Sequence, residues 1–416
     1  MSDMQSMLSP PWPTPLRQCR RLLNMHAQKV LKDGRIFAIM KYVRATVLYD
    51  GTGRSARKNV FIGYEGDKVG GITTAEPRGD FIAEGVVTPA FIDGHSHIGL
   101  ARSGEPSAEE EGNEHMDPML PLVNVLDSVY MDDSAFSESI EHGVLYSHVM
   151  PGSGNIIGGR TALIRNFAGD IHEALISVPG IKAAMGFNPR STTDWKGNRP
   201  STRMGAVSIL RNELTKASKA SRLLKKRRKT ADELEPQTEA LINILSGRQR
   251  LMVHVHKEDD IVNLISLMDQ FGFGAVINHA GDVHSQRLWD IVLKRGLKVI
   301  YGPVDAFSYK VELKHENWKN VKYISESRVD YCLMTDHPVV LQRNLFLQLR
   351  FFLRFGLTKE QSIALITGNA ADILGCTEIG VLEKGRMASF TVWNKDPFSL
   401  DAWPVAVIGE GRTLVG

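Results

Sequence analysis

Apolar, strand-like runs that alternate with longer segments of helical period constrain the fold of this chain more than any other feature. Eight such runs occur in order: residues 91–97, 144–149, 161–165, 181–186, 250–256, 275–279, 298–302 and 331–335. Alternation of this kind is typical of repeated βα units around a parallel sheet, and a (β/α)8 barrel needs eight of them. We therefore predict an α/β fold built on a TIM-type (β/α)8 barrel over residues 89–378.

The segments on either side of the predicted barrel have the pattern of short strands and turns. Residues 40–88 contain candidate strands at 43–48, 59–64, 68–72 and 81–88, and residues 379–416 return to strand and turn. We expect the two segments to meet in a small β-sandwich domain formed by the N- and C-terminal ends. Residues 1–39, with four closely spaced prolines, predict a poorly ordered N-terminal extension; a transit sequence and a translation start at Met40 are the alternatives.

Composition excludes several classes of protein. A net charge of +3 from 50 basic and 47 acidic residues gives no reason to expect nucleic acid or an anionic membrane as a partner. The basic run 225–229 is more simply a solvated helix face than a nucleic-acid contact. Three cysteines without regular spacing favour a reducing cytoplasm, and we find no apolar run of the roughly 18–20 residues that a membrane-spanning helix requires.

Histidines and one aspartate end several of the predicted barrel strands. The first strand ends in His95-Ser96-His97, and side chains two positions apart on a strand share a face, so both imidazoles can hold one cation. The fifth ends in His254 and His256, the sixth in His279 and the eighth in Asp336. A single histidine at a strand end is more often a packed residue than a ligand, but this joint pattern indicates a metal site at the barrel mouth. Imidazole and carboxylate ligands favour zinc, iron or manganese over magnesium or calcium.

Six segments together resemble the amidohydrolase superfamily, and within it the imidazolonepropionase-related metal-dependent hydrolases. They are residues 88–97, 253–256, 278–281, 335–338, 368–375 and 380–385. The resemblance implies a (β/α)8 barrel beside a β-sandwich, with a hydrolytic site at the barrel mouth. It implies the following ligands for one divalent transition metal, zinc first and iron or manganese as alternatives: His95, His97, His254, His279 and Asp336.

The resemblance also implies roles for these side chains. Asp336 would take a proton from the attacking water and return it to the leaving nitrogen, and His279 would bind the metal or contact the substrate. His256 shares a face with His254, so which of the two is the fifth-strand ligand stays open, and His256 is a candidate substrate contact. Asn155, in a glycine-rich loop that lacks the Gly-Lys-Ser/Thr ending of a phosphate-binding loop, and Asn188 are further substrate-binding candidates.

The number of metal ions is the point on which this chain departs from many superfamily members. Those members hold two ions through a carboxylated lysine at the mouth of the fourth strand or through an acid nearby. Here Lys182 lies near the start of the predicted fourth strand, and Phe187 stands where relatives carry an acid. We therefore expect a single tightly bound ion, with a weak second site as the alternative.

The predicted function is that of a metal-dependent hydrolase acting on carbon–nitrogen bonds other than peptide bonds, in a cyclic amide or a related small molecule. A deaminase or a dipeptidase of the same superfamily is one alternative, and a non-catalytic amidohydrolase-like scaffold is another. The expected partner is a small-molecule substrate, with no nucleic acid and no membrane, and assembly into a homo-oligomer is compatible with the sequence.

Overall fold

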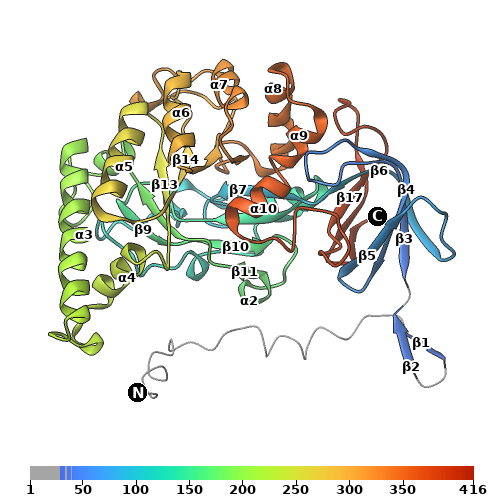
Figure 1. Cartoon of the computed structure of the whole chain (residues 1–416), viewed down its shortest axis with the longest axis horizontal. Helices are drawn as coiled ribbons and strands as arrows, with labels where there is room; N and C mark the ends of the chain where they lie inside the picture. The colour runs from blue at the N-terminus through green and yellow to red at the C-terminus, as the bar shows by residue number, and fades with distance from the viewer. Residues whose placement is uncertain (1–28, 33–34, 39) are drawn as a thin grey trace.

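The computed structural model describes residues 29–32, 35–38 and 40–416. Most of the expected extension 1–39 lies outside these residues, and within it only the antiparallel strands β1 (Lys29–Lys32) and β2 (Arg35–Ala38) are described. In Figure 1 a β-sheet region lies at one end of the molecule (right), and helices lie around the other end. The candidate ligands lie on the strands of the helical part.

A six-stranded sheet carries five parallel strands, each of which coincides with a predicted run. Its order is β16-β15-β14-β13-β12-β9. The parallel strands are β12 (Ile181–Ala184), β13 (Leu251–Val255), β14 (Ala275–His279), β15 (Lys298–Tyr301) and β16 (Tyr331–Leu333). Strand β9 (Ile157–Arg160) pairs antiparallel to β12. Because the five strands share one direction, their carboxyl ends lie at one edge of the sheet.

A four-stranded sheet, with the order β11-β10-β8-β7, contains the first three predicted runs. Its strands are β7 (Phe91–Ser96), β8 (Val144–Val149), β10 (Ala162–Arg165) and β11 (Leu175–Ser177). Strands β7 and β8 are parallel, as expected. The third run is an exception, because β10 is antiparallel to β8.

The expectation of eight parallel strands in one barrel is therefore wrong at the third strand, and the hydrogen bonds among the described residues form two sheets rather than one closed ladder. A parallel neighbour needs a long crossover, usually a helix, but the chain between β8 and β10 holds a loop and β9 only. Thr161 alone separates β9 from β10, so one continuous stretch of chain passes from one sheet into the other.

Strands β7 and β16 approach each other closely where the two sheets meet. A Cβ atom on Gly94 of β7 would lie 2.7 Å from the Leu333 carbonyl oxygen, so only glycine fits there. Past the ends of these strands, the Asp336 amide donates to the His95 carbonyl at 3.0 Å. This contact brings two of the predicted ligand positions together.

Strands from both ends of the chain join in one seven-stranded sheet, with the order β19-β18-β17-β6-β3-β4-β5. The N-terminal segment supplies β3 (Lys41–Leu48), β4 (Arg57–Glu65), β5 (Lys68–Thr73) and β6 (Asp80–Pro89), and the C-terminal segment supplies β17 (Phe390–Trp393), β18 (Pro404–Gly409) and β19 (Arg412–Val415). The junction is the antiparallel pair β6–β17. The two ends of the chain thus meet in a single hydrogen-bonded sheet, and the β-sandwich domain stays a prediction.

Helices surround the parallel strands. They are α1 (Ser134–Glu141), α2 (Ile171–Ala174), α3 (Arg203–Lys225), α4 (Pro236–Leu245), α5 (Glu258–Phe271), α6 (Gln286–Lys294), α7 (Val321–Glu326), α8 (Leu349–Arg354), α9 (Lys359–Ala364) and α10 (Gly368–Leu374). The short 3-10 turns are η2 (Ser107–Glu109), η3 (Val125–Asp127), η4 (Asn188–Arg190), η5 (Ala231–Glu233), η6 (Val311–Leu313), η7 (Trp318–Asn320), η8 (Gln342–Asn344) and η9 (Phe346–Gln348). The main core lies between helices and strands and includes Leu264, Trp289 and Phe352, all buried.

Thr358 and Gln361, which have the Ser/Thr-x-x-Gln sequence pattern of a capping box, form one that opens α9. The sequence suggests one helix from there towards Gly375, but the structure has two, α9 and α10. The interruption has a clear cause: the Leu365 carbonyl accepts the Leu333 amide at 3.0 Å, and the Ile366 carbonyl accepts the Ile92 amide at 2.8 Å. These carbonyls bond to β16 and β7 instead of continuing a helix.

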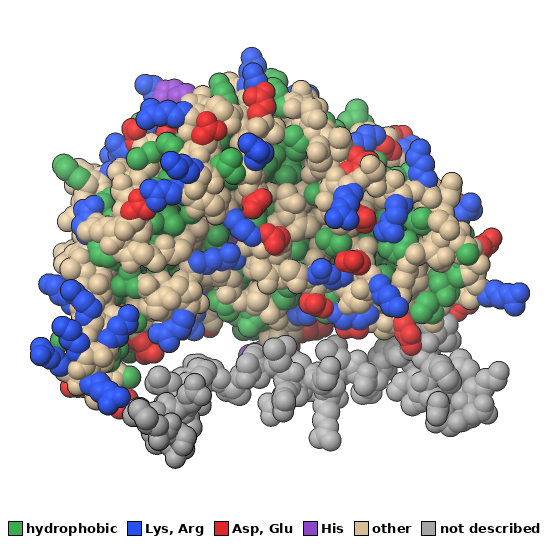
Figure 2. Space-filling model, viewed as in Figure 1, with side chains coloured by type: hydrophobic (Ala, Val, Ile, Leu, Met, Phe, Trp, Pro, Cys, Tyr) green, Lys and Arg blue, Asp and Glu red, His purple; other side chains and the backbone are tan. Residues whose placement is uncertain are grey.

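The basic run 225–229 begins at the last residue of α3 and is largely exposed. Figure 2 shows blue side chains gathered at the lower left, over the lower end of this helix. Within the described part of the chain, no helix combines the length and the apolar character needed to cross a membrane.

Candidate metal centre

The strand ends bring the predicted ligands together in two groups. His95, His97 and Asp336 form the first group, from the ends of β7 and β16; His254, His256 and His279 form the second, from the ends of β13 and β14. Within each group, one ligand atom per residue can be chosen so that all lie within 4.8 Å of one another. The His95 and His279 rings, with centroids 4.8 Å apart, connect the two groups.

The first group is arranged around the carboxylate of Asp336. Its Oδ1 lies 3.3 Å from Nε2 of His95 and 3.2 Å from Nε2 of His97. His97 Nδ1 donates to the Met150 carbonyl at 2.7 Å, and because a carbonyl only accepts, Nδ1 carries the proton. The His97 Nε2 lone pair is therefore available to a cation.

In the second group, three ring nitrogens are buried without a hydrogen-bond partner: Nδ1 of His254, Nδ1 of His256 and Nε2 of His279. The opposite nitrogen is occupied in the rings of His254 and His279. His279 Nδ1 lies 3.1 Å from the Gly302 carbonyl, and His254 Nε2 lies 3.2 Å from the carboxylate of Glu312. A buried polar atom without a partner costs free energy, so these nitrogens fit positions that an absent ligand would satisfy.

Burial also sets the charge state of the centre. It is the main cause that holds the pKa values of His95, His254 and His279 well below their ordinary value, so these rings are neutral and can act as ligands. Burial alone would raise the pKa of Asp336, but electrostatic interactions with the surrounding imidazoles, first His279 and then His95 and His97, hold it well below its usual value. Asp336 is therefore a carboxylate.

The backbone is strained at the same place. His279, Ala280 and Asp336 have φ angles of 79°, 56° and 52°, in a region that non-glycine residues seldom adopt. Such strain persists only where the surroundings impose it, and it concentrates at functional sites. Here it directs the side chains that follow β14 and β16 towards one another.

Lys182 lies near the start of the fourth strand, as the sequence predicts, because it is the second residue of β12. Its fully buried side chain nevertheless reaches the candidate ligands, with Nζ 3.3 Å from His95 Nε2. Burial lowers the pKa of this amine to about 7. The position of Lys182 along the strand does not indicate where its amine lies, because a lysine side chain can span several ångströms of the interior.

Glu312 is a site residue that the sequence did not reveal. It lies in η6, after β15, and is 1% exposed, with one carboxylate oxygen 2.9 Å from the Phe187 amide. The sequence has no acid at position 187, but the carboxylate of Glu312, from a loop distant in sequence, lies beside that position. No local pattern around Glu312 could have indicated this, because the loop contains neither a strand end nor a motif.

Asp93 ties the two ligand-bearing strands to each other. It is buried, and it accepts hydrogen bonds from the Thr335 amide at 2.9 Å, from the Thr335 hydroxyl, and from Gln342 Nε2 at 3.0 Å. Burial raises the pKa of Asp93 to about 6 despite these bonds. The contacts fix Thr335, and with it the residue that follows, Asp336.

The predicted substrate contacts lie in different surroundings. His256 is buried and stacks on His279, with ring centroids 4.6 Å apart, and Asn188 Nδ2 lies 3.3 Å from His254 Nε2. Asn155 stabilises a loop, because its side-chain amide donates to the carbonyls of Glu114 at 2.9 Å and Asp117 at 3.0 Å. His256 and Asn188 adjoin the centre, whereas Asn155 holds a neighbouring loop.

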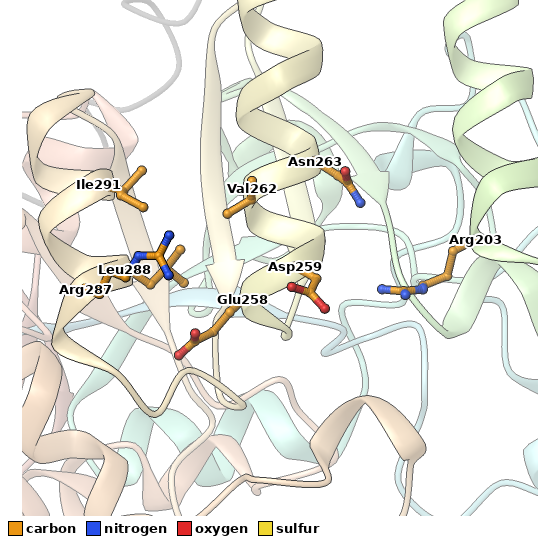
Figure 3. Close-up of a pocket in the computed structure, with 8 residues that line it drawn as sticks. All are labelled: Arg203, Glu258, Asp259, Val262, Asn263, Arg287, Leu288 and Ile291. Carbon is orange, nitrogen blue, oxygen red and sulfur yellow. The ribbon is translucent and has the colours of Figure 1, made fainter.

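A separate pocket of about 480 Å³ lies on the surface and contains none of the candidate ligands. Figure 3 shows it between the first turns of α5 and α6, with Arg203 of α3 on its far side. Arg203 is engaged with the buried Asp260 at 2.8 Å. The pocket is therefore a feature of the helical surface and not of the histidine centre.

Comparison with known proteins finds amidohydrolases. Residues 219–414 match the model of the amidohydrolase family. An amidohydrolase from Thermotoga maritima has a TM-score of 0.83 and 28% sequence identity, over 90% of this chain and 99% of that one. The chain is thus similar to the amidohydrolase superfamily. The narrower resemblance to imidazolonepropionase-related hydrolases stays a prediction.

Other amidohydrolase relatives are more distant. Amidohydrolase tasK of Hapsidospora irregularis is 25% identical over 358 residues, which are 78% of this chain but 36% of that protein. The chain thus spans about a third of the length of this curated relative. Two solved structures share the fold at lower identity. A prolidase complexed with N-methylphosphonate-L-proline has 13% identity and a TM-score of 0.58, over 90% of this chain and 99% of that one. The A. niger ochratoxinase has 12% identity and a TM-score of 0.52, over 91% of this chain and 96% of that one.

Proposed function

We propose that this protein is a metal-dependent hydrolase of the amidohydrolase superfamily that cleaves a carbon–nitrogen bond in a small molecule, a cyclic amide or a related compound. The observation that carries the proposal is the gathering of the strand-end imidazoles beside the Asp336 carboxylate, with three buried ring nitrogens left without a hydrogen-bond partner. A protein does not keep such donors buried at no cost. A bound cation would satisfy them.

The ion is proposed to be a divalent transition metal, zinc first and iron or manganese next, because the donors are imidazole nitrogens and a carboxylate. His95, His97 and Asp336 would hold it at one side, and His254 and His279 at the other. The expectation of a single ion depends on the absence of a lysine at the fourth-strand mouth and of an acid at position 187. Since Lys182 reaches His95, the first of these reasons no longer holds, and a second ion between the groups becomes the alternative to test.

The fold proposed around this centre is a TIM-type barrel. In this proposal the six-stranded and four-stranded sheets are two parts of one wall, and the seven-stranded sheet takes the place of the flanking β-sandwich. Two observations support this. The continuous stretch β9–β10 joins the two sheets on one side, and the hydrogen bond between Asp336 and His95 links their other edges, which are formed by β16 and β7. The centre then lies at the mouth, where barrel enzymes place their active sites.

The chain's own residues would divide the chemistry as follows. The metal, when bound, would lower the pKa of water and polarise the carbonyl under attack. Asp336, a carboxylate in the resting site, would accept a proton from the attacking water and deliver it to the leaving nitrogen. His256 and Asn188, beside the ligands, would contact the substrate, and Asn155 would act indirectly by holding the loop at residues 114–117.

Two alternatives use the same residues. A deaminase or a dipeptidase would need the same ligands and the same proton carrier, because both reactions add water at a carbon bonded to nitrogen. A non-catalytic scaffold would have no need for a complete set of ligands, and here all five converge. The proposed partner is accordingly a small-molecule substrate.

The test is a hydrolysis screen of the zinc-loaded protein against four classes of compound: cyclic amides, N-acyl amino acids, dipeptides and aminopurines. Turnover of a cyclic amide that is lost in Asp336→Asn supports the proposal. Turnover confined to dipeptides or aminopurines supports the corresponding alternative. No turnover in any class, together with no bound metal, would leave the scaffold as the better account.

A further inference from the structure

A third group of potential ligands lies outside the candidate centre, in the loops that follow β14 and β15. Asp282, His284 and His315 can each present one ligand atom, and these atoms lie within 4.8 Å of one another. We propose that this group is a second, peripheral site for a transition-metal ion. It shares no residue with the centre formed by the strand ends.

Asp282 is preorganised for this role. It is 1% exposed, which is unusual for a carboxylate, and its Oδ1 accepts the backbone amide of His315 at 2.5 Å. Its Oδ2 lies 3.3 Å from His315 Nδ1. The buried carboxylate therefore fixes the loop that carries one of the two imidazoles.

His284 is held with one ring nitrogen free. Its Nδ1 lies 2.7 Å from the Asp282 carbonyl oxygen, which can only accept, so Nδ1 carries the proton and Nε2 keeps its lone pair. The side chains of His284 and His315 are 45% and 43% exposed, so an ion can reach them from solvent. Their ring centroids are 4.4 Å apart with an interplanar angle of 38°, which places the two rings against each other.

The donor set selects the class of ion. Two imidazoles and one carboxylate are a ligand combination that zinc takes in proteins, with water in the remaining position. Calcium and magnesium prefer oxygen ligands and would gain little from two nitrogens. Glu258 adds negative charge at the edge of the site, since its carboxylate accepts the His284 amide at 3.1 Å.

Lys257 is the one described cation close to the carboxylate, with Nζ 3.8 Å from Asp282 Oδ2. An ammonium at that distance opposes a metal ion electrostatically, because both are attracted to the same oxygen. Removing its charge should therefore tighten metal binding. An accidental cluster of histidines would show no such response.

The peripheral site lies on two loops that border the candidate centre. Asp282 follows the candidate ligand His279 by three residues, and His315 follows Glu312, which contacts His254, by the same interval. An ion bound to both loops would join the segment after β14 to the segment after β15. The peripheral ion would then restrict the movement of two loops that border the centre.

The experiment is a calorimetric titration of the full chain with Zn²⁺, after the protein has been saturated with zinc at its tight sites and desalted. We expect one further equivalent per chain. In the double variant His284→Gln/His315→Gln this equivalent should disappear, because the loss of two ligands costs more than the roughly 10–100-fold in affinity typical of losing an outer partner. In Lys257→Met it should bind several-fold more tightly.

The control is His172→Gln, which removes a different exposed histidine, near α2, and should leave the titration unchanged. The substituted histidines are exposed and Lys257 is partly exposed, and equal thermal midpoints would verify the fold. No further equivalent in the wild type, or one that persists in the double variant, would overturn the proposal. The titration counts ions beyond the tight sites, so it is independent of whether the protein is a hydrolase.

Discussion

At the scale of single residues, Asp336 and His256 of the centre have different tasks. Asp336 is positioned between two imidazoles as a proton carrier, whereas His256 stands beside the ligands. Asp336→Asn should lower kcat by about 10²–10⁴-fold, the usual contribution of general acid–base catalysis, and His256→Asn by much less. Steady-state kinetics on the substrate found in the screen measures both, and equal activity in the two variants would refute this division of roles.

Glu312 is expected to act through His254. Its carboxylate, at 3.2 Å from Nε2, fixes the ring so that Nδ1 faces the centre. Loss of such a partner typically weakens metal affinity about 10–100-fold, so Glu312→Gln should release zinc to a chelator at a lower chelator concentration. The matched control is Glu326→Gln, an exposed carboxylate in α7, and an identical chelator midpoint in both variants would contradict the role of Glu312.

Lys182 provides a separate test of the centre. A buried amine that served only the fold could be replaced by Met, which has similar length and no charge, without consequence for metal binding. Because burial lowers the pKa of this amine to about 7, Lys182 can be neutral and donate to an ion beside His95, unlike the ammonium of Lys257. We therefore expect Lys182→Met to bind fewer equivalents of zinc while its metal-free form unfolds at a urea concentration no lower than the wild type. An unchanged zinc content would show that Lys182 lies beside the centre without contributing to it.

The histidines of the centre could be predicted from sequence because each ends a strand, and parallel strands place their ends at one edge. Lys182 and Glu312 could not be placed in the same way. Lys182 reaches the centre by the length of its side chain, and Glu312 by the course of a loop. The positions of both residues depend on distances across the protein interior, which cannot be predicted from a local sequence pattern.

At the scale of elements, the helix that follows β16 is divided for a physical reason. The capping box of Thr358 and Gln361 starts α9, and the carbonyls of Leu365 and Ile366 then leave the helix to bond with β16 and β7. The cap was readable from sequence, but the interruption was not, because it results from hydrogen bonds to strands more than thirty residues away. Likewise, the reversed direction of β10 follows from a connection without a helix.

The capping box should have a measurable share in stability. Thr358 Oγ1 accepts the Gln361 amide at 3.2 Å, and the Gln361 side chain accepts the Thr358 amide at 2.9 Å. Replacing Thr358 with Ala should lower the free energy of unfolding by about 1 kcal/mol, and Thr358→Ser should restore most of it. Urea unfolding of the metal-free proteins measures the difference, and equal midpoints for Ala and Ser would exclude the cap as the cause.

At the scale of the whole molecule, the candidate ligands come from segments up to about 240 residues apart and meet only when the two sheets come together. Binding to the folded chain alone stabilises it by mass action, about 2.7 kcal/mol when free metal is 100-fold above Kd. Zinc should therefore raise the thermal midpoint of the wild type. In a His95→Ala/His97→Ala variant, which lacks two of the ligands, the midpoint should move far less.

The central claim is that the strand-end histidines and Asp336 form a transition-metal centre, and metal analysis of the purified protein tests it most directly. After expression with zinc and exhaustive desalting, elemental analysis of the wild type should find at least one tightly held equivalent per chain. The His95→Ala/His97→Ala variant, prepared in parallel, should lose it. A wild type that holds no transition metal, or a variant that holds as much as the wild type, would contradict the account.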